Sequence, residues 1–199
     1  MVTSGAHASD QEIERVSPAR PRRFTVAEYS RMIDSGILDE DEHVELLEGE
    51  IVQRSPQEKP HARATSRLTR WVTRFLGDEY AVRCQLPLTL PDSEPEPDLA
   101  IVRTREEDTA DRHPRTALLV IEVADSSARY DLSVKARIYA RAGIPEFWLV
   151  LVQQRTIEVL RDPDEVAGVY ASRLSIGVGA TVTPSALPGP AIDVSALFA

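Results

Sequence analysis

A run of aliphatic residues, ALLVIEVA, occupies residues 117–124. Its length and its largely apolar composition predict a strand that is buried on both faces of a sheet. One carboxylate, Glu122, interrupts the run. A carboxylate in such a strand costs several kcal/mol of desolvation unless it is protonated or compensated by a cation and hydrogen bonds. The pattern therefore predicts a central strand in which Glu122 has a specific partner.

The rest of the chain predicts helices and strands around this one. Apolar residues at helical spacing predict a helix at residues 61–76, and the alternation in residues 80–90, YAVRCQLPLTL, predicts a half-buried strand. The other predicted elements are a capped helix at 25–33, a hairpin about Glu48–Gly49, a strand at 98–103, a charged loop at 104–116, a helix at 131–142, strands at 146–152 and 155–162, and short C-terminal strands. The central order of helix, strand, strand, strand, helix and strand indicates an α/β or α+β protein.

Composition predicts how the chain is organised. Residues 1–22 lack apolar periodicity and end in a Pro/Arg-rich patch, so we expect a disordered arm followed by a single domain at residues 23–199. The length of 199 residues and the 42% apolar content suffice for one sizeable core. One cysteine, no signal-like segment and no long uncharged apolar run predict a soluble, cytoplasmic protein with no membrane partner.

The charge of the chain limits how it can bind nucleic acid. A net charge of −9 argues against a protein that coats nucleic acid through bulk electrostatics. Any contact must therefore be local, and one cationic stripe offers it: four arginines in the predicted helix at residues 61–76 follow a spacing that places them on one face. They are Arg63, Arg67, Arg70 and Arg74. They could contact a phosphate backbone, and the alternative is an ordinary solvated helix face.

Glu122, Asp98 and Lys135 could form one site. Asp98 opens the strand at residues 98–103, so its carboxylate converges with that of Glu122 if the two strands are neighbours. A divalent ion such as Mg²⁺ would compensate both carboxylates. Lys135 shares a helix face with Asp131 and Tyr139, and it is one of only two lysines among 23 basic residues. This use of lysine suggests that a compact ammonium is required there.

Each of these residues also has a plainer explanation. Glu122 could pair with one of the many arginines, or its strand could be less buried than its neighbours imply. Asp98 follows Pro97, where aspartate is common in turns. Lys135 could form a solvated ion pair with Asp131, which is worth only a few tenths of a kcal/mol.

Three segments, EPEPDLAIV at 94–102, LLVIEVADSS at 118–127 and DLSVKARIYARAGIPEFWLV at 131–150, resemble the Uma-type, restriction-endonuclease-like branch of the PD-(D/E)XK nucleases. The upstream HVELLEGEIVQRSP and His61 are similar to the N-terminal pattern of that family. The resemblance covers roughly residues 24–161, and four separated blocks occur in order. It implies a restriction-endonuclease-like core with the helix and strand order described above.

The resemblance also implies roles for individual residues. It places the acidic positions of the motif at Asp98 and Glu122, but the superfamily lysine two residues later is Ala124 here. In the Uma-type branch a helix lysine resembling Lys135 is thought to reach the same space. The implied supporting residues around this lysine and the metal are Asp131, Tyr139 and His61. His61 follows Pro60 at a helix start, where a purely structural role is an equal alternative. Glu45 is implied as a further catalytic carboxylate, whereas periodicity alone leaves it as a surface strand residue.

The expected function is Mg²⁺- or Mn²⁺-dependent hydrolysis of phosphodiester bonds in DNA. Asp98, Glu122 and the Val123 carbonyl would hold the metal, and Lys135 would orient or deprotonate the attacking water. Nucleases of this fold often act as dimers, so a homodimer is expected by analogy. The alternative is a catalytically silent nuclease fold that binds DNA or a partner protein, which Ala124 and the acidic net charge favour. A small-molecule hydrolase lacks support because Ser126-Ser127 has no flanking Gly-x-Ser-x-Gly pattern.

Overall fold

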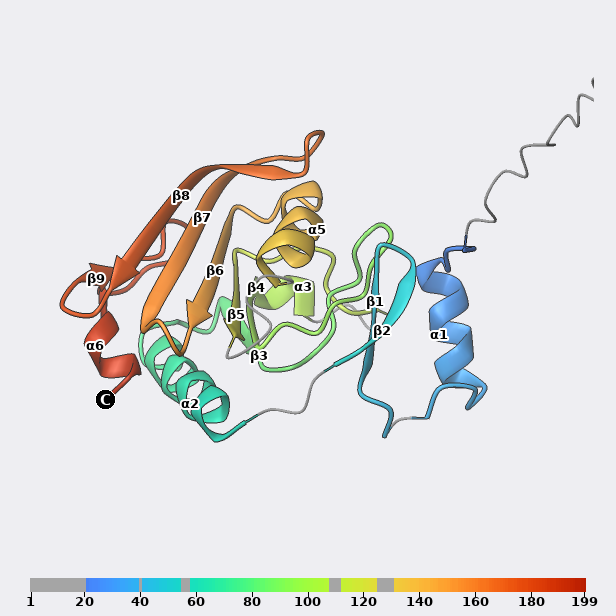
Figure 1. Ribbon diagram of the computed structural model, residues 1–199, viewed down its shortest axis with the longest axis horizontal. Helices are drawn as coiled ribbons and strands as arrows, with labels where there is room; N and C mark the ends of the chain where they lie inside the picture. Colours follow the sequence, from blue (N-terminus) through green and yellow to red (C-terminus); the bar gives the residue numbers. More distant parts are fainter. Residues whose placement is uncertain (1–20, 40, 55–57, 108–111, 125–130) are drawn as a thin grey trace, which may run out of the picture.

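The computed structural model describes residues 21–39, 41–54, 58–107, 112–124 and 131–199 (Figure 1). Most of the predicted N-terminal arm, residues 1–20, lies outside the described residues, as does the segment 125–130 that joins the central strand to the following helix. The side chain of Asp131 is also not described. The elements that carry the other candidate side chains are all present.

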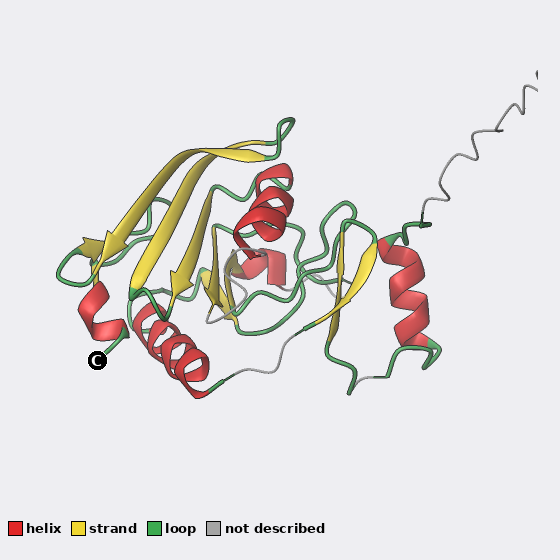
Figure 2. Cartoon of the chain, viewed as in Figure 1, coloured by secondary structure: helices red, strands yellow, loops and turns green. Residues whose placement is uncertain are grey.

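A six-stranded mixed sheet forms the centre of the molecule (Figures 1 and 2). Its strands, in spatial order, are β3 (Tyr80–Arg83), β4 (Leu99–Arg103), β5 (Leu119–Ala124), β6 (Glu146–Leu151), β7 (Thr156–Asp164) and β8 (Val169–Gly177). β5 and β6 are parallel, and every other neighbouring pair is antiparallel. All six residues of β5 are buried, as expected for a central strand with its side chains packed on both faces.

Helices cover the two faces of this sheet. Helix α2 (Lys59–Thr73) packs through Leu68 and Val72 against Ile121 and other odd-numbered residues of β5. The opposite face holds even-numbered residues such as Val120, which pack with helix α5 (Ala136–Arg141). Because successive side chains of a strand alternate between faces, Glu122 projects toward α5.

The helix predicted at residues 131–142 has two parts. Residues Asp131–Lys135 form a π-helical turn, η1, and α5 continues from it as an α-helix. A π-helical turn is a rare local widening of the helix, often found at functional sites. Lys135 is the last residue of this turn, so the widening lies at the cation of the candidate site.

The N-terminal helix and hairpin form as predicted. Helix α1 (Val26–Asp34) begins with a complete capping box between Thr25 and Glu28. Strands β1 (Val44–Leu47) and β2 (Glu50–Gln53) are joined by Glu48 and Gly49, whose φ angles are 48° and 79°. Two consecutive positive φ angles are typical of the hairpin turn whose twist matches that of its strands. This hairpin is a separate two-stranded sheet.

Two predicted segments differ from the structure. The strand predicted at residues 80–90 stops at Arg83, because Gln85 has a positive φ of 52° and Pro87 cannot donate a ladder hydrogen bond. Cys84 and Leu86 are consequently exposed. The charged loop predicted from Thr104 begins instead with a short helix, α3 (Thr104–Glu107).

The C-terminal segment folds against the end of the sheet near α2 (Figure 1). It contains the strands β9 (Thr181–Val182) and β10 (Ile192–Asp193), which agree with the predicted short strands, and a final helix, α6 (Val194–Leu197), which was not predicted. Val194 and Leu197 join the core beneath α2. Within the described part of the chain, no helix has the length and apolar character that a membrane crossing requires.

Candidate functional site

The register of the sheet brings two predicted carboxylates together. Leu99 of β4 pairs with Ile121 of β5 in an antiparallel ladder, so Asp98, just before β4, lies at the end of the ladder where β5 continues to Glu122. Both side chains are almost completely enclosed, with 3% of Asp98 and 5% of Glu122 exposed. The convergence expected from the sequence therefore has a simple structural cause: Asp98 directly precedes β4, whose first residue pairs with the residue before Glu122.

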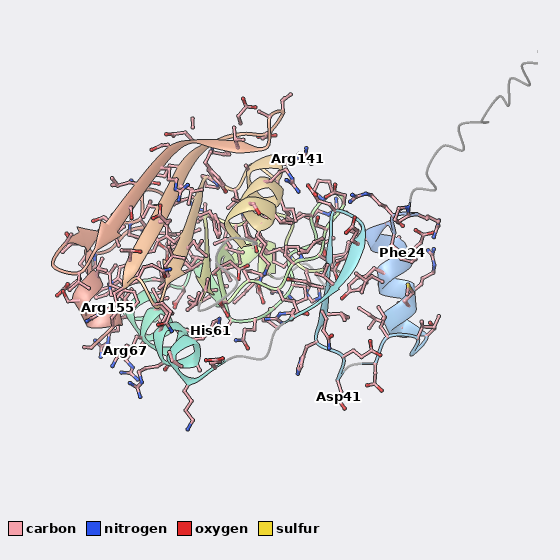
Figure 3. The ribbon with its side chains drawn as sticks, viewed as in Figure 1. Phe24, Asp41, His61, Arg67, Arg141 and Arg155 are labelled. Carbon is pink, nitrogen blue, oxygen red and sulfur yellow. The ribbon has the colours of Figure 1, made fainter. Side chains whose placement is uncertain are left out.

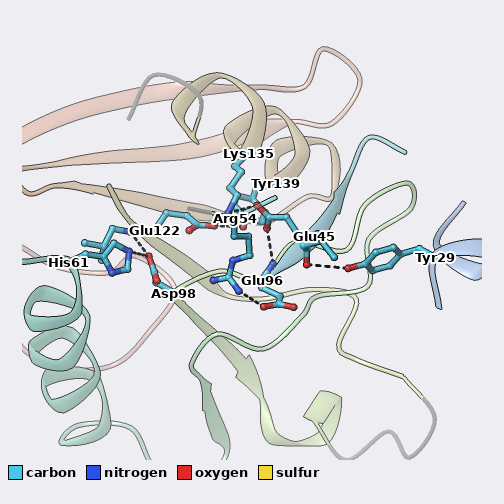
Figure 4. Close-up of polar contacts among 11 residues, drawn as sticks. Tyr29, Glu45, Arg54, His61, Glu96, Asp98, Glu122, Lys135 and Tyr139 are labelled. Atoms are coloured by element: carbon cyan, nitrogen blue, oxygen red, sulfur yellow. Dashed lines mark hydrogen bonds and ion pairs between the residues drawn. The ribbon is translucent and has the colours of Figure 1, made fainter. Parts of the chain in front are cut away.

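Asp98 is held by contacts from both sides (Figure 4). Its Oδ2 accepts a hydrogen bond of 2.8 Å from the backbone N–H of Val123 and lies 3.0 Å from Nε2 of His61. His61 stands in the first turn of α2, directly after Pro60. The start of this helix thus delivers an imidazole to the carboxylate that opens β4.

The contact with Asp98 changes the pKa of His61. Burial opposes its protonation, but the hydrogen bond to Asp98 and the charges of Asp98 and Glu122 outweigh that effect and raise the pKa of His61. The Val123 backbone raises this pKa as well. The Nδ1 atom of His61 is buried and has no hydrogen-bond partner among the described residues.

Glu122 is bound by two residues of the following helix. Nζ of Lys135 donates to its Oε1 at 3.0 Å, and the hydroxyl of Tyr139 donates to the same atom at 2.7 Å. Lys135 and Tyr139 are four residues apart, so they project from the same side of η1 and α5 onto β5. Both are buried, and the plainer explanation of Lys135 as a solvated surface lysine is excluded.

Glu45 joins the cluster from the separate hairpin. Its Oε1 lies 3.2 Å from Nζ of Lys135, and its Oε2 accepts a hydrogen bond of 3.1 Å from the backbone N–H of Glu96. Only 4% of Glu45 is exposed, so the alternative of a surface strand residue is wrong. The ammonium of Lys135 thus bridges two carboxylates from different sheets.

The hairpin that carries Glu45 is fastened to α5 at its turn. Arg137 donates to both carboxylate oxygens of Glu48, from Nε and from Nη2, each at 2.7 Å, and Arg141 adds a contact of 3.0 Å. At the other side, the Tyr29 hydroxyl donates to the Val44 carbonyl at 3.2 Å. The position of Glu45 is therefore set by contacts with α1 and α5 together with backbone bonds to the segment before β4, where the Glu94 N–H donates to the Leu46 carbonyl at 2.7 Å.

An ion pair that sequence reasoning missed lies beside these residues. Arg54, just after β2, pairs with Glu96, just before Asp98 (Figure 4). Burial raises the pKa of Glu96, and the guanidinium of Arg54 opposes that effect. The acidic, proline-rich segment before Asp98 was the available signal for Glu96, but nothing in the sequence connects Arg54 with it.

The four arginines of the predicted stripe do not share one environment. Arg67 is half-buried and donates from Nη1 to the carbonyl of Leu197 at 2.9 Å, so it binds the C-terminal helix (Figure 3). The other three stripe residues, Arg63, Arg70 and Arg74, are exposed. The predicted supporting role of Asp131 stays a prediction, because its side chain lies outside the described residues.

The donor atoms suit a hard divalent cation. Asp98 and Glu122 are buried carboxylates at neighbouring ends of β4 and β5, and Mg²⁺ is commonly held by one or two protein carboxylates with water and substrate oxygens completing its shell. Across the described ranges, no group of three or more His, Cys, Asp or Glu side chains is arranged to hold a metal ion. The arrangement therefore fits a water-rich Mg²⁺ or Mn²⁺ site and does not fit a closed four-ligand zinc site.

Comparisons with known proteins agree with this fold. Residues 26–195 match the Uma2 family, described as "Putative restriction endonuclease". The chain is also similar to a crystal structure described as a putative nuclease belonging to DUF820 from Anabaena variabilis ATCC 29413, with a TM-score of 0.69 and 16% sequence identity over 88% of this chain and 97% of that chain. No curated protein sequence matches the chain. The predicted nuclease-like α/β fold is thus confirmed, and the chain belongs to the Uma2 family of putative restriction endonucleases.

Proposed function

We propose that this protein is a Mg²⁺-dependent endonuclease that hydrolyses phosphodiester bonds in DNA. The observation that carries the proposal is the cluster in which Asp98 binds the backbone N–H of Val123, directly after Glu122, and Lys135 binds Glu122 from the helix. The family match supports a nuclease, and the enclosed acidic site supports metal-assisted chemistry. Mn²⁺ is the expected substitute because it prefers the same oxygen ligands.

Each residue of the candidate site has a distinct role in this proposal. Asp98, Glu122 and the Val123 carbonyl would hold the ion, which when bound supplies Lewis-acid stabilisation of the phosphate and an activated water. Lys135, held between Glu45 and Glu122, orients the water. Tyr139 and His61 hold the two carboxylates in place through their 2.7 Å and 3.0 Å contacts. Glu45 holds the ammonium of Lys135 from the opposite side.

DNA would approach the cluster along the start of α2. His61 is in the first turn of this helix, and the exposed arginines Arg63, Arg70 and Arg74 lie farther along it. They supply local positive charge on a chain whose net charge is −9. Arg67 is placed less well for this task, since its guanidinium binds the Leu197 carbonyl.

The test is cleavage of plasmid and single-stranded DNA with Mg²⁺ or Mn²⁺. The wild-type protein should cut at least one of these substrates, and Glu122→Ala and Lys135→Ala should each remove the activity. Arg22→Ala is the control, because Arg22 is an exposed cation that pairs with Glu28 away from the cluster and from α2. Activity that survives both site substitutions would rule out the site. Metal-independent DNA binding without cleavage would instead support the catalytically silent alternative.

The second copy of a homodimer would pair along β8. This strand is at one edge of the sheet, and six of its nine residues are exposed, including Val169 and Leu174 at 53% and 55%. A long edge strand offers unpaired backbone groups to another chain. Antiparallel pairing of two copies would also place the acidic turn at Asp164 and Glu165 of one copy beside the turn that contains Arg155 of the other, because β7 aligns these turns with opposite ends of β8.

A further inference from the structure

Among the residues that the structure describes, the cluster contains more carboxylates than permanent cations. The described residues place four carboxylates here, those of Glu45, Glu96, Asp98 and Glu122. The permanent cations beside them are Lys135, which contacts Glu45 and Glu122, and Arg54, which contacts Glu96. A nucleic-acid substrate adds a further anion at this place. Besides a metal ion, the site therefore needs a side-chain cation that can reach the substrate.

Lys135 is poorly placed to be that cation. Its side chain is only 7% exposed, and its ammonium contacts Glu45 at 3.2 Å and Glu122 at 3.0 Å. Moving it toward a phosphate would leave two enclosed carboxylates without their shared partner, which is strongly unfavourable. Lys135 therefore stays in the buried part of the cluster, between Glu45 and Glu122.

Arg54 differs from Lys135 in the features that matter. Its side chain is 19% exposed, and the carboxylate that it binds, Glu96, is 27% exposed, so this ion pair borders solvent. Figure 4 shows its side chain beside Glu96, to which a dashed line joins it. A planar guanidinium can form two parallel hydrogen bonds to a phosphate, which an ammonium cannot.

The surrounding structure fixes where Arg54 can reach. Its backbone N–H donates to the His43 carbonyl at 2.7 Å, which continues the hairpin ladder beyond β2. The backbone N–H of Glu96 donates to Glu45, so the partner of Arg54 is anchored to the same hairpin. Arg54 is thus held at the border of the cluster by the element that also supplies Glu45.

We infer that Arg54 binds a phosphate group of the nucleic-acid substrate and that Glu96 holds its guanidinium until the substrate arrives. This inference rests on the proposed nuclease function, because it names the side chain that receives the substrate at the same site. On binding, the guanidinium exchanges the carboxylate of Glu96 for a phosphate, and no covalent bond changes.

Substitutions of the two partners give opposite expectations. Arg54→Gln removes a charge-assisted contact with the phosphate, so the affinity for DNA should fall roughly tenfold to a hundredfold. The slope of the logarithm of affinity against the logarithm of salt concentration should become shallower by about 0.9, as expected for one lost phosphate contact. Arg54→Lys should fall between Arg54→Gln and the wild type. Glu96→Gln should raise the affinity, because the guanidinium no longer has to leave a carboxylate.

The measurement is fluorescence anisotropy of a labelled DNA duplex and of the corresponding single strand, with Ca²⁺ in place of Mg²⁺. Arg22→Gln is the matched control, since it breaks another arginine–glutamate ion pair, with Glu28, outside the cluster. Thermal melting of each variant establishes that it is folded, and Arg54→Lys and Glu96→Gln both retain a hydrogen-bonding side chain if Arg54→Gln is unstable.

The outcomes separate this inference from the proposed function. Equal DNA affinity for Arg54→Gln and the wild type, or a parallel loss in Arg54→Gln and Glu96→Gln, would show that the ion pair is merely structural and overturn the inference. Cleavage by the wild type could stand in either case. Conversely, opposite shifts in Arg54→Gln and Glu96→Gln would support the inference even if no metal produces cleavage. A wild-type protein that binds neither DNA probe would overturn the inference.

Discussion

The ammonium of Lys135 lies 3.0 Å from Oε1 of Glu122, although 13 residues separate the two along the chain. The lysine position of the superfamily motif, two residues after Glu122, is occupied by Ala124, which is 1% exposed and packs in the core with α5. Because residues 122 and 124 share a face of β5, the helix that covers Ala124 is also the element that brings a lysine to Glu122. The cation is therefore supplied from above the sheet rather than from within the strand.

Removal of this cation should destabilise the protein strongly. Lys135→Met leaves Glu45 and Glu122 enclosed without their shared ammonium, and breaking a buried ion pair in this way costs about 3–5 kcal/mol. Urea denaturation at neutral pH measures the change in the free energy of unfolding. Lys59→Met should have almost no effect, since Lys59 is exposed. Equal stability of the two variants would mean that Lys135 does not compensate these carboxylates.

The hydroxyl of Tyr139 should contribute more than an ordinary tyrosine hydrogen bond. Tyr139→Phe removes a 2.7 Å donor to a buried carboxylate, and hydrogen bonds to charged groups are worth about 1.5–3 kcal/mol. Tyr170→Phe is the matched comparison, because the Tyr170 hydroxyl donates to the neutral carbonyl of Ile144 at 2.9 Å and should cost only about 0.5–1.5 kcal/mol. Denaturation of both variants under the same conditions compares their losses in the free energy of unfolding. The two losses should be equal if Glu122 carries no charge.

Metal binding should be detectable without any assay of cleavage. Mg²⁺ at 100 times its dissociation constant should stabilise the wild-type protein by about 2.7 kcal/mol, since a ligand that binds only the folded state raises its stability by mass action. Asp98→Asn and Glu122→Gln should each lose most of this stabilisation in thermal melts with increasing Mg²⁺. Glu50→Gln, on the exposed part of β2, should retain it. Equal responses in all four proteins would contradict the metal site.

The fastening of the hairpin should depend on pH. The hydrogen bonds from Arg137 lower the pKa of Glu48 below its ordinary value of 4.5, and the nearby charges of Arg137 and Arg141 act in the same direction despite partial burial. Because this pKa is lower in the folded chain, Glu48 contributes stability above pH 4.5, and that contribution is lost as the pH falls through the lowered value. Glu48→Gln should therefore be less stable than the wild type at neutral pH, and the gap should narrow in acid.

Denaturant titrations over a pH series measure this narrowing. The control is Glu50→Gln. Glu50 lies on the same hairpin and forms an exposed ion pair with Arg23. This control should follow the pH dependence of the wild type. A gap between Glu48→Gln and the wild type that stays constant into acid would show that the charge on Glu48 is unimportant.

Dimer formation should depend on the edge of the sheet. We expect the wild-type protein to sediment as a dimer, and Leu174→Lys should shift it toward the monomer, because a charged side chain on an exposed edge strand opposes pairing. Ile37→Lys changes another exposed apolar residue, 66% exposed and away from β8, and should leave the dimer intact. Sedimentation velocity over a range of concentrations distinguishes these results. A monomeric wild type would refute the proposed pairing.

Much of the fold was accessible from local sequence patterns. The capping box at Thr25, the hairpin turn at Glu48–Gly49 and the buried strand around Glu122 each depend on residues close together in the chain. Helical spacing also placed Lys135 and Tyr139 on one face, and their resemblance to the family motif suggested where that face points. The strand predicted through Leu90 failed because one residue, Gln85, adopts a left-handed backbone conformation that alternation of side chains does not reveal.

The sequence by itself thus determined the main helices and strands, the two acidic positions and the helix lysine, because these follow from periodicity and short motifs. Only the tertiary structure decided that Glu45 and Lys135 meet, that Arg67 binds the C-terminal helix, and that Arg54 stands beside Glu96. Such pairs join elements far apart in the chain, and which charges meet depends on how the hairpin, the helices and the sheet pack together. A charged residue has the same local pattern whether it faces solvent or another element, so its partner is set by the packing.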